Sequence, residues 1–408
     1  MTRRSAGIAR LIAASGISWS GDWALTTAAS VAVFRETGST AAVSLLLALA
    51  AIPAVILAPL AGAVADRHDR RKIMLSADLA SAVVLLALLP ALGTGAELPA
   101  VYAAVLALGI FATFHRPASE ALLPSLAPPA QLSRANSALR LAQRLGFIGG
   151  PAAGAWLIDR GGLETVFVVD AVTFFVSSLI IAAIPRVRAS ATGATESTFR
   201  AAAAGFRYAR DQRNLRIVII SVGITMLVAP IVNAGTVVFV ADELEESESW
   251  YGWLLAAQGI GAIAFAAALI VLGPRTRLLP TGFIALVVTG SSVLLLATSA
   301  SVAPAIVAMV TMGMGVVGLQ VAFASYLQRE AHDAYRGRIM GLVATVASIG
   351  NLVGLAITPL AVLALGVRPA FAVAGAIIIL SALPILSMLR NGSASEVAPA
   401  ADRASSRP

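Results

Sequence analysis

The chain has 408 residues, of which 58% are hydrophobic and only 12% are charged, and its formal net charge is +8. An average soluble domain has roughly 25% charged residues, which help to cover its surface with polar groups. The low charge content excludes an ordinary soluble protein and indicates that lipid is the main solvent. The lack of cysteine excludes disulfides, thiolate nucleophiles and thiolate metal sites.

Other catalytic chemistries also find no support in the sequence. The histidines His68, His115 and His332 are far apart in the chain, so a histidine metal cluster is not expected. The single lysine, Lys72, follows two arginines and does not fit a GxxxxGK[ST] phosphate loop. We therefore expect neither an enzyme nor a resident metal or organic cofactor.

Long apolar stretches dominate the chain. A helix that crosses a membrane needs about 20 mostly apolar residues. The apolar residues run continuously and do not alternate with polar ones, which argues against an outer-membrane barrel. The sequence therefore predicts an all-α integral membrane protein with twelve transmembrane helices. The predicted spans are 8–34, 41–65, 73–93, 98–122, 136–159, 164–185, 214–241, 250–273, 278–298, 301–328, 336–365 and 368–390.

The basic residues predict the orientation of these spans. Arginine and lysine concentrate in the cytoplasmic loops of multi-pass proteins. If both termini are cytoplasmic, most basic residues lie in or beside cytoplasmic segments, and the acidic run at 242–248 lies outside. Only Arg35, Arg160 and Arg368 then fall on the outer side. The positive charge thus indicates topology and not a nucleic-acid partner, and we expect a bacterial inner-membrane location.

A long polar stretch, 186–213, separates six predicted spans from six. The sequence therefore predicts bundles at 1–185 and 214–390, a cytoplasmic linker at 186–213 and a disordered cytoplasmic tail at 391–408. Within and just beyond the linker, Thr198–Arg216 alternates apolar residues with arginines. This pattern predicts an amphipathic helix on the anionic inner leaflet, and a solvated charged linker is the alternative.

The loop between the second and third spans carries a charged motif. Residues 62–72 read GAVADRHDRRK. A glycine lets helices approach closely, an aspartate can meet a helix N-terminus, and arginines bind carboxylates and lipid phosphates. We expect Asp78, in the third span, to pair with an arginine of this loop. A simple positive-inside loop is the alternative. The gate residues predicted here are Gly62, Asp66, Arg67, Arg70, Arg71 and Asp78.

A glycine-rich motif, GFIGGPAAG, lies in the fifth span at 146–154. Small residues every four positions allow tight helix packing, and a proline bends the helix by removing a backbone hydrogen bond. The motif could therefore assist rocking between two states, or serve only in packing. Its residues are Gly146, Gly150, Pro151 and Gly154.

These two motifs carry a family resemblance. The GxxxDRxxRR pattern resembles the signature loop of the major facilitator superfamily, and GxxxGPxxG resembles the antiporter motif of its exporters. The segments 114–124, 170–177, 203–210 and 328–341 are similar to the branch that includes the enterobactin exporter and macrolide-efflux proteins, called transmembrane secretion effectors.

The resemblance implies a major facilitator fold of two pseudo-symmetric six-helix bundles. It also implies that the 62–72 loop is a cytoplasmic latch stabilising the outward-open state. Spans one, four, seven and ten would surround a central cavity. The implied activity is proton-driven efflux of amphipathic small molecules by a monomer, with no cofactor other than the proton gradient.

Ionisable groups inside a span are costly and therefore indicate function. Asp22 lies roughly 21 Å along the first span at about 1.5 Å per residue, deep inside the hydrocarbon. It shares a helix face with Ser15, Ser18, Trp19 and Thr26. We expect Asp22 to be the proton-coupling acid. The alternative is a structural carboxylate that accepts hydrogen bonds from serines on a neighbouring helix.

Further residues could line the cavity. Arg116 and Glu120 are four apart on the fourth span and could pair, and their depth differs from that of Asp22, so no bridge between Arg116 and Asp22 is required. The other candidates are polar or aromatic and could instead hold helices together. They are Trp19, Trp23, Thr26, Asn233, Gln258, Gln320 and Asn351.

The sequence thus predicts a secondary active transporter that exports drugs, siderophores or secondary metabolites by proton antiport with alternating access. Its expected partners are a small-molecule substrate and the lipid bilayer. The alternatives are a nutrient importer or facilitator of the same fold, and a non-transporting membrane sensor.

Overall fold

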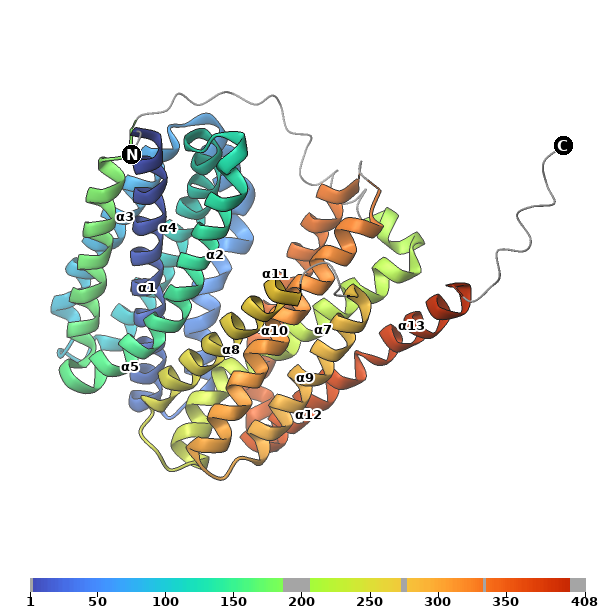
Figure 1. The fold of residues 1–408 in the computed structure, drawn as a ribbon. Coiled ribbons are helices and arrows are strands. Elements are labelled where there is room, and N and C mark those ends of the chain that lie inside the picture. Colours follow the sequence, from blue (N-terminus) through green and yellow to red (C-terminus); the bar gives the residue numbers. More distant parts are fainter. Residues whose placement is uncertain (1–2, 186–205, 273–276, 333–334, 397–408) are drawn as a thin grey trace.

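Helices account for nearly the whole structure, a computed structural model that describes residues 3–185, 206–272, 277–332 and 335–396 (Figure 1). The first half contains α1 (Arg3–Thr37), α2 (Thr40–Arg67), α3 (Arg70–Leu88), η1 (Leu89–Ala91), α4 (Glu97–Leu126) and α5 (Pro129–Ala182). The second half contains α7 (Arg213–Val238), η2 (Phe239–Glu243), α8 (Trp250–Leu272), α9 (Leu278–Thr298), α10 (Val302–Glu330), α11 (Arg336–Leu365), α12 (Val367–Leu380) and α13 (Leu383–Glu396). The described ranges contain no strand.

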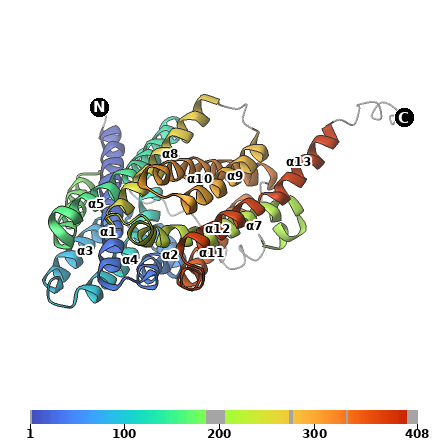
Figure 2. The ribbon, with the colours of Figure 1, turned by 90° about the horizontal axis from the view of Figure 1, so that it is seen from below.

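The helices form two bundles that lie side by side (Figure 2). In the first, α1 packs on α5, α2 packs on α4, and α3 packs on both α4 and α5. In the second, α10 packs on α8 and α9, α12 packs on α9, and α11 packs on α7. The bundles contact each other mainly through α5 with α8 and α2 with α11.

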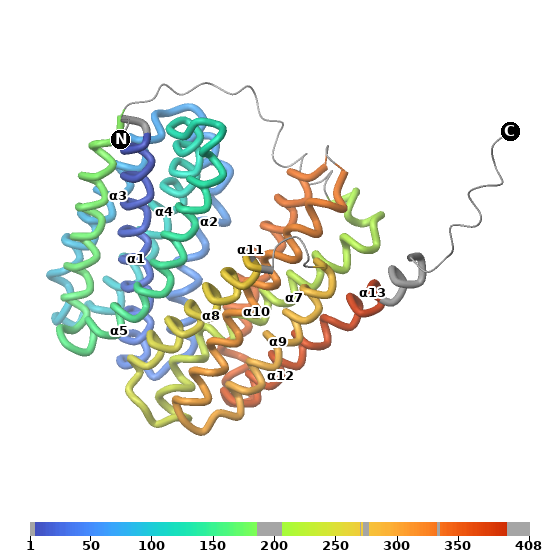
Figure 3. The backbone as a smooth tube through the Cα atoms, in the orientation of Figure 1, coloured from blue at the N-terminus to red at the C-terminus, as the bar shows by residue number. Residues whose placement is uncertain are grey.

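The molecule has two distinct faces. The amino face holds Arg3, Asp69 and Ala182, which begin or end helices of the first bundle. The opposite face, called the turn face, holds Gly38, Gly93, Gly95, Gly162 and Gly366, all with positive φ. The bundles meet at the turn face and separate toward the amino face (Figures 1 and 3).

The chain reverses direction inside α5, at Gly162. This residue has φ 67° and ψ −174°, a conformation that a side chain would disfavour. The predicted fifth and sixth spans, 136–159 and 164–185, are therefore the two arms of one continuous element joined by a very tight turn.

Ten helices of the described chain are long and apolar enough to cross a membrane. This number takes α5 as a single helix and leaves out α1, whose apolar run is interrupted by Ser15, Ser18 and Asp22. Large apolar side chains such as Val271 and Leu363 are almost fully exposed, as expected for groups that face lipid. The count of twelve spans stays a prediction.

The last predicted span, 368–390, is interrupted. The chain turns at Ser381 and Ala382, and α13 then begins at Leu383. Pro384 is its second residue, where the missing N–H and the ring prevent a continuous helix. Because α13 ends at Glu396, the first residues of the predicted tail 391–408 are helical, and 397–408 lie outside the described residues.

The end of the polar linker packs on the second bundle. Residues 206–211 are helical, and Tyr208 stacks on Tyr335 with ring centroids 4.5 Å apart. The Tyr208 hydroxyl accepts a hydrogen bond from the His332 backbone N–H at 3.3 Å. The predicted helix Thr198–Arg216 is interrupted at Gln212, and its part before residue 206 lies outside the described residues.

Candidate functional site

A central cavity of about 550 Å³ lies between the bundles, lined by α1, α2, α4 and α5 from one and by α7, α8 and α11 from the other. Most of its wall is apolar, with a few polar groups, which is typical of pockets for small molecules. Its polar and aromatic lining includes Trp19, Asp22, Trp23, Thr26, Arg116, Phe147, Asn233, Tyr251, Gln258 and Asn351.

A second cavity, of about 360 Å³, shares Trp19, Trp23, Phe147 and Gln258 with the first. It lies nearer the amino face, because its other polar residues come from the beginning of α5 and the end of α10. Those residues are Arg140, Gln143, Arg144 and Gln320. The Arg144 guanidinium donates to the Gln320 side-chain oxygen at 2.6 Å and so joins the two bundles.

The polar face of α1 borders these cavities. Ser15 and Ser18 are buried, and the Ser15 hydroxyl lies 3.2 Å from the Ser119 hydroxyl of α4. Asp22 is half-buried, and no side chain among the described residues donates a hydrogen bond to its carboxylate. The serine-bonded structural role considered for Asp22 is therefore absent from this conformation, and the coupling role stays a prediction.

Arg116 lies closer to Asp22 than its position in the sequence indicated. Its guanidinium carbon lies 4.8 Å from the centre of the Trp19 ring, and both residues line the central cavity with Asp22. Arg116 is also within electrostatic range of Asp22. The different depths expected for Arg116 and Asp22 were wrong, because α1 and α4 cross in the bundle and bring these positions together.

Glu120 takes no part in this arrangement. It is exposed, it forms no ion pair with Arg116, and it does not line the cavities described here. Arg116 turns instead toward Trp19, whose ring attracts the guanidinium. The prediction that Arg116 and Glu120 could pair is therefore wrong.

Asp78 also differs from its predicted position. It was expected to pair with Arg70 or Arg71, but it is only 2% exposed and neither arginine donates a hydrogen bond to it. Its Oδ1 lies 3.4 Å from Nε2 of His115, which is also buried. The loop arginines find other acceptors, so Asp78 does not belong to the gate motif in this conformation.

The sequence offered one signal for His115 that the interpretation missed. His115 stands next to Arg116 in the middle of an apolar span. Two ionisable side chains are costly to place there, and such side chains indicate function.

Asp170, of α5, lies beside Gly21 and within electrostatic range of both Asp22 and Asp78. The three carboxylates therefore lie in one region of the first bundle.

The glycine motif of α5 packs against α1. A Cβ at Gly150 would lie 2.6 Å from the Ser20 carbonyl oxygen, and one at Gly154 would collide with the Ala24 carbonyl. A Cβ at Gly146 would lie 3.2 Å from the Ser20 backbone nitrogen. On the other side of α5, the Pro151 carbonyl lies against Gly252 of α8. The motif thus joins the helix that carries Asp22 to the contact between the bundles.

Hydrogen bonds within the loop and to neighbouring helices hold the charged loop at 68–69. Asp69 caps α3 by accepting the Arg71 backbone N–H at 3.0 Å. Arg70 donates to the Ala65 carbonyl and to the Ser125 hydroxyl, at 3.2 and 3.3 Å. The Arg71 side chain donates to the Ile181 and Ala182 carbonyls, where a helix C-terminus favours positive charge.

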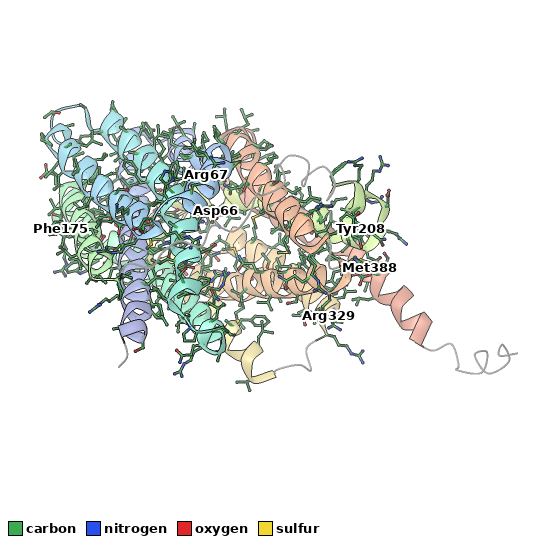
Figure 4. The ribbon with its side chains drawn as sticks, turned by 90° about the horizontal axis from the view of Figure 1, so that it is seen from above. Asp66, Arg67, Phe175, Tyr208, Arg329 and Met388 are labelled. Atoms are coloured by element: carbon green, nitrogen blue, oxygen red, sulfur yellow. The ribbon has the colours of Figure 1, made fainter. Side chains whose placement is uncertain are left out.

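The other residues of the predicted latch, Gly62, Asp66 and Arg67, make no close contact with a second described helix. A Cβ at Gly62 would meet nothing within 4 Å, so the close helix approach expected there is absent. Asp66 and Arg67 are exposed at the end of α2 (Figure 4). Both observations follow from the separation of the bundles at the amino face.

Ion pairs join the helices at the turn face. Arg35 of α1 donates to Asp159 of α5 and to Glu248 before α8, both at 3.0 Å. Arg368 donates to Glu243 and to the Ala297 and Ser299 carbonyls. The basic residues that are exceptions to the predicted topology therefore have specific partners, and the Arg35–Glu248 pair crosses between the bundles.

Three polar residues of the second bundle face the central cavity without protein partners. The side chains of Asn233, Gln258 and Asn351 make no hydrogen bond with other described residues. Their amide groups are thus available to a ligand, whereas Gln320 is bound to Arg144. A substrate role for these residues stays a prediction.

Known proteins with similar sequences are transporters. The chain is 25% identical over 396 residues to the uncharacterized MFS-type transporter YfiS of Bacillus subtilis (strain 168), covering 93% of each chain. It is 24% identical over 372 residues to macrolide efflux protein A of Streptococcus pyogenes, covering 87% of this chain and 90% of that one. It is 27% identical over 335 residues to multidrug efflux pump Tap of Mycolicibacterium fortuitum, covering 79% and 81%.

Solved structures share the fold. The nucleoside transporter NupG matches with a TM-score of 0.74 at 14% identity, covering 96% of this chain and all of that one (100%). A bacterial homologue of the iron transporter ferroportin, in an inward-facing state, matches with a TM-score of 0.71 at 16% identity, covering 93% and 98%. A model of the Major Facilitator Superfamily matches residues 11–355. The chain therefore belongs to the Major Facilitator Superfamily and is a multi-pass membrane transporter, not an enzyme.

Proposed function

We propose that this transporter exports amphipathic small molecules from the cytoplasm across the bacterial inner membrane by proton antiport. The observation that carries the proposal is the position of Asp22, which is half-buried and unpaired in a large apolar cavity between the bundles. A carboxylate in such a place can exchange a proton when the cavity alternately faces the two sides of the membrane.

The predicted topology places the amino face in the cytoplasm. The open arrangement then has its cavities accessible from the cytoplasm, and the Arg35–Glu248 pair closes the outer side. The apolar wall, Trp19 and Trp23 suit drugs, siderophores or secondary metabolites of amphipathic character. Two relatives, named for macrolide and multidrug efflux, support export.

Reconstitution in liposomes tests the proposal. A pH gradient should drive substrate movement by the wild-type protein, and Asp22→Asn should abolish that drive while exchange without a gradient continues. Glu120→Gln is the matched control, because Glu120 is an exposed acid outside the cavities. If Asp22→Asn retains gradient-driven movement, Asp22 is not the coupling acid.

A susceptibility panel identifies the substrate and the direction. Deletion of the gene should raise, and overexpression should lower, the accumulation of exported drugs or siderophores, and a protonophore should cancel the difference. The opposite change for a nutrient would establish the importer alternative.

A further inference from the structure

The first bundle contains a buried cluster of ionisable groups apart from the substrate cavity. Asp78 of α3, His115 of α4 and Asp170 of α5 are 2%, 6% and 1% exposed. The Asp78 Oδ1 and His115 Nε2 atoms are 3.4 Å apart. Asp78 Oδ2, His115 Nε2 and Asp170 Oδ2 are buried and have no hydrogen-bond partner in the described structure. Buried polar atoms are rarely left without a partner, so these atoms require an explanation.

A small cavity lies among these groups. Its volume is about 20 Å³, and roughly 10–15 Å³ is enough to hold one water molecule that has two to four polar partners. Its polar lining supplies such partners from three helices. They are Ser18, Asp22, Asp78, Ser81, His115 and Arg116.

Asp22 lies on the boundary between the two cavities. Asp22 and Arg116 line both the small cavity and the central one, whereas Asp78 and His115 line only the small one. A substrate in the central cavity can therefore approach Asp22 from one side. The buried pair of Asp78 and His115 faces Asp22 from the other side.

The charges of the cluster require bound protons. The ionisable groups that face one another are Asp22 from α1, Asp78 from α3, His115 and Arg116 from α4, and Asp170 from α5. If all three carboxylates were ionised, Arg116 alone would balance one of them. Uncompensated buried charges are strongly unfavourable, so protons must neutralise the remainder.

Asp170 is already fixed in place. Its Oδ1 accepts a hydrogen bond from the Thr173 hydroxyl at 3.0 Å, and it fills the space that a side chain at Gly21 would occupy. Asp170 therefore lies beside the cluster and does not line the small cavity.

We propose that Asp78 and His115 form a buried proton-holding pair that exchanges a proton with Asp22 through a water molecule in the small cavity. In this step the O–H bond of the Asp78 carboxyl, which lies beside the His115 imidazole, breaks. A new O–H bond forms on the Asp22 carboxylate, and the net charge of the cluster is unchanged. A substrate that enters the central cavity then displaces this proton from Asp22 to water in that cavity, and the buried pair regains a proton through the same small cavity when Asp22 is next protonated.

This inference rests on the proposed function, and transport measurements can separate the two. In liposomes, Asp78→Asn and His115→Gln should lose gradient-driven accumulation and keep substrate exchange without a gradient. His332→Gln, which alters an exposed histidine outside the 62–72 loop, should behave as wild type. Failure of the wild-type protein to respond to a gradient would refute the proposed function. Full gradient-driven accumulation in both cluster variants would refute only the buried pair.

Nuclear magnetic resonance tests the pair without any substrate. The chain has three histidines, and His68 and His332 are exposed, so ¹⁵N-histidine spectra of the whole protein in detergent contain two internal references. The signal lost in His115→Gln is that of His115. We expect Asp78→Asn to change the pH at which this signal titrates and to leave the other two unchanged. If Asp78→Asn does not fold, the milder Asp78→Glu should produce the same kind of change. A His115 signal that responds to neither variant would overturn the proposal.

Discussion

At the scale of single residues, Trp19 connects the parts of the site. It lines the central cavity, the second cavity of about 360 Å³ and the small buried cavity, and Arg116 lies over its ring. A guanidinium on an indole gains about 2 kcal/mol when it is shielded from water and about 0.5–1 kcal/mol when it is exposed. Trp19 therefore holds Arg116 beside Asp22 and at the same time forms part of the wall of the central cavity.

Replacement of this indole should weaken transport. We expect Trp19→Leu to lower substrate affinity on the order of tenfold, since it removes both the aromatic wall and the ring under Arg116. Binding to purified protein and efflux from loaded cells would measure the effect. Trp156→Leu is a matched control, because Arg160 lies over Trp156 at 5.1 Å on the outer surface of the bundle. Equal losses in both variants would contradict a cavity role for Trp19.

At the scale of helices, the glycine face of α5 determines how closely α1 can lie. Gly146, Gly150 and Gly154 remove the side chains that would otherwise separate the two backbones. In lipid, helices gain little from burying apolar surface, so close packing of small residues supplies much of their association. The position of Asp22 therefore depends on residues of a different helix.

Addition of one methyl group should disturb this contact. We expect Gly154→Ala to destabilise the folded protein by about 1–3 kcal/mol, because its Cβ would collide with the Ala24 carbonyl. Thermal unfolding in detergent would measure the change. Gly149→Ala, on the same helix, is the matched control because a Cβ there meets nothing within 4 Å. An unchanged midpoint for Gly154→Ala would show that α1 is not held by this face.

The same physics explains what could be predicted from the sequence. Long apolar runs identified the membrane character and the approximate spans, and glycine spacing identified α5 as a packing helix. The direction that Asp78 faces could not be predicted, since lipid and protein interior are both apolar and leave no periodic pattern to distinguish them. The proximity of His115, Asp78 and Asp170 depends on how three helices cross, which a single sequence does not encode in any local signal.

At the scale of the whole molecule, two bundles meet at the turn face and separate at the amino face. The α5–α8 contact and the Arg35–Glu248 pair hold the turn face together. Because Arg35 also binds Asp159, the same guanidinium fixes α5 and crosses to the second bundle. Any state open at the turn face must break the crossing pair.

Loss of the crossing pair should favour opening of the turn face. The Arg35 and Glu248 side chains are 36% and 27% exposed, and pairs of this kind contribute about 0.2–1 kcal/mol. We therefore expect Arg35→Gln to change the ratio of the two states by at most about fivefold. The lack of native cysteine lets spin labels be attached to two introduced cysteines without background.

Electron–electron distance distributions across the turn face would measure this ratio. Arg160→Gln is the control, because Arg160 lies on the same face but contacts Trp156 within its own bundle. An increase of the long-distance population in both variants would mean that surface charge, and not the crossing pair, controls opening.

The short connections between helices at the turn face also leave few exposed segments to which a binding reagent could attach from that side. Glycine turns join most neighbouring helices there, and the longest connection, 244–249, carries Glu245, Glu246 and Glu248. A nanobody with a basic loop would find an exposed acidic epitope in this segment. Because Glu248 is also the partner of Arg35, such a nanobody would compete with the pair that closes this face. In the proposed topology, where this face is the outer one, an antibody fragment that binds this segment would act on the conformational cycle as well as mark the protein.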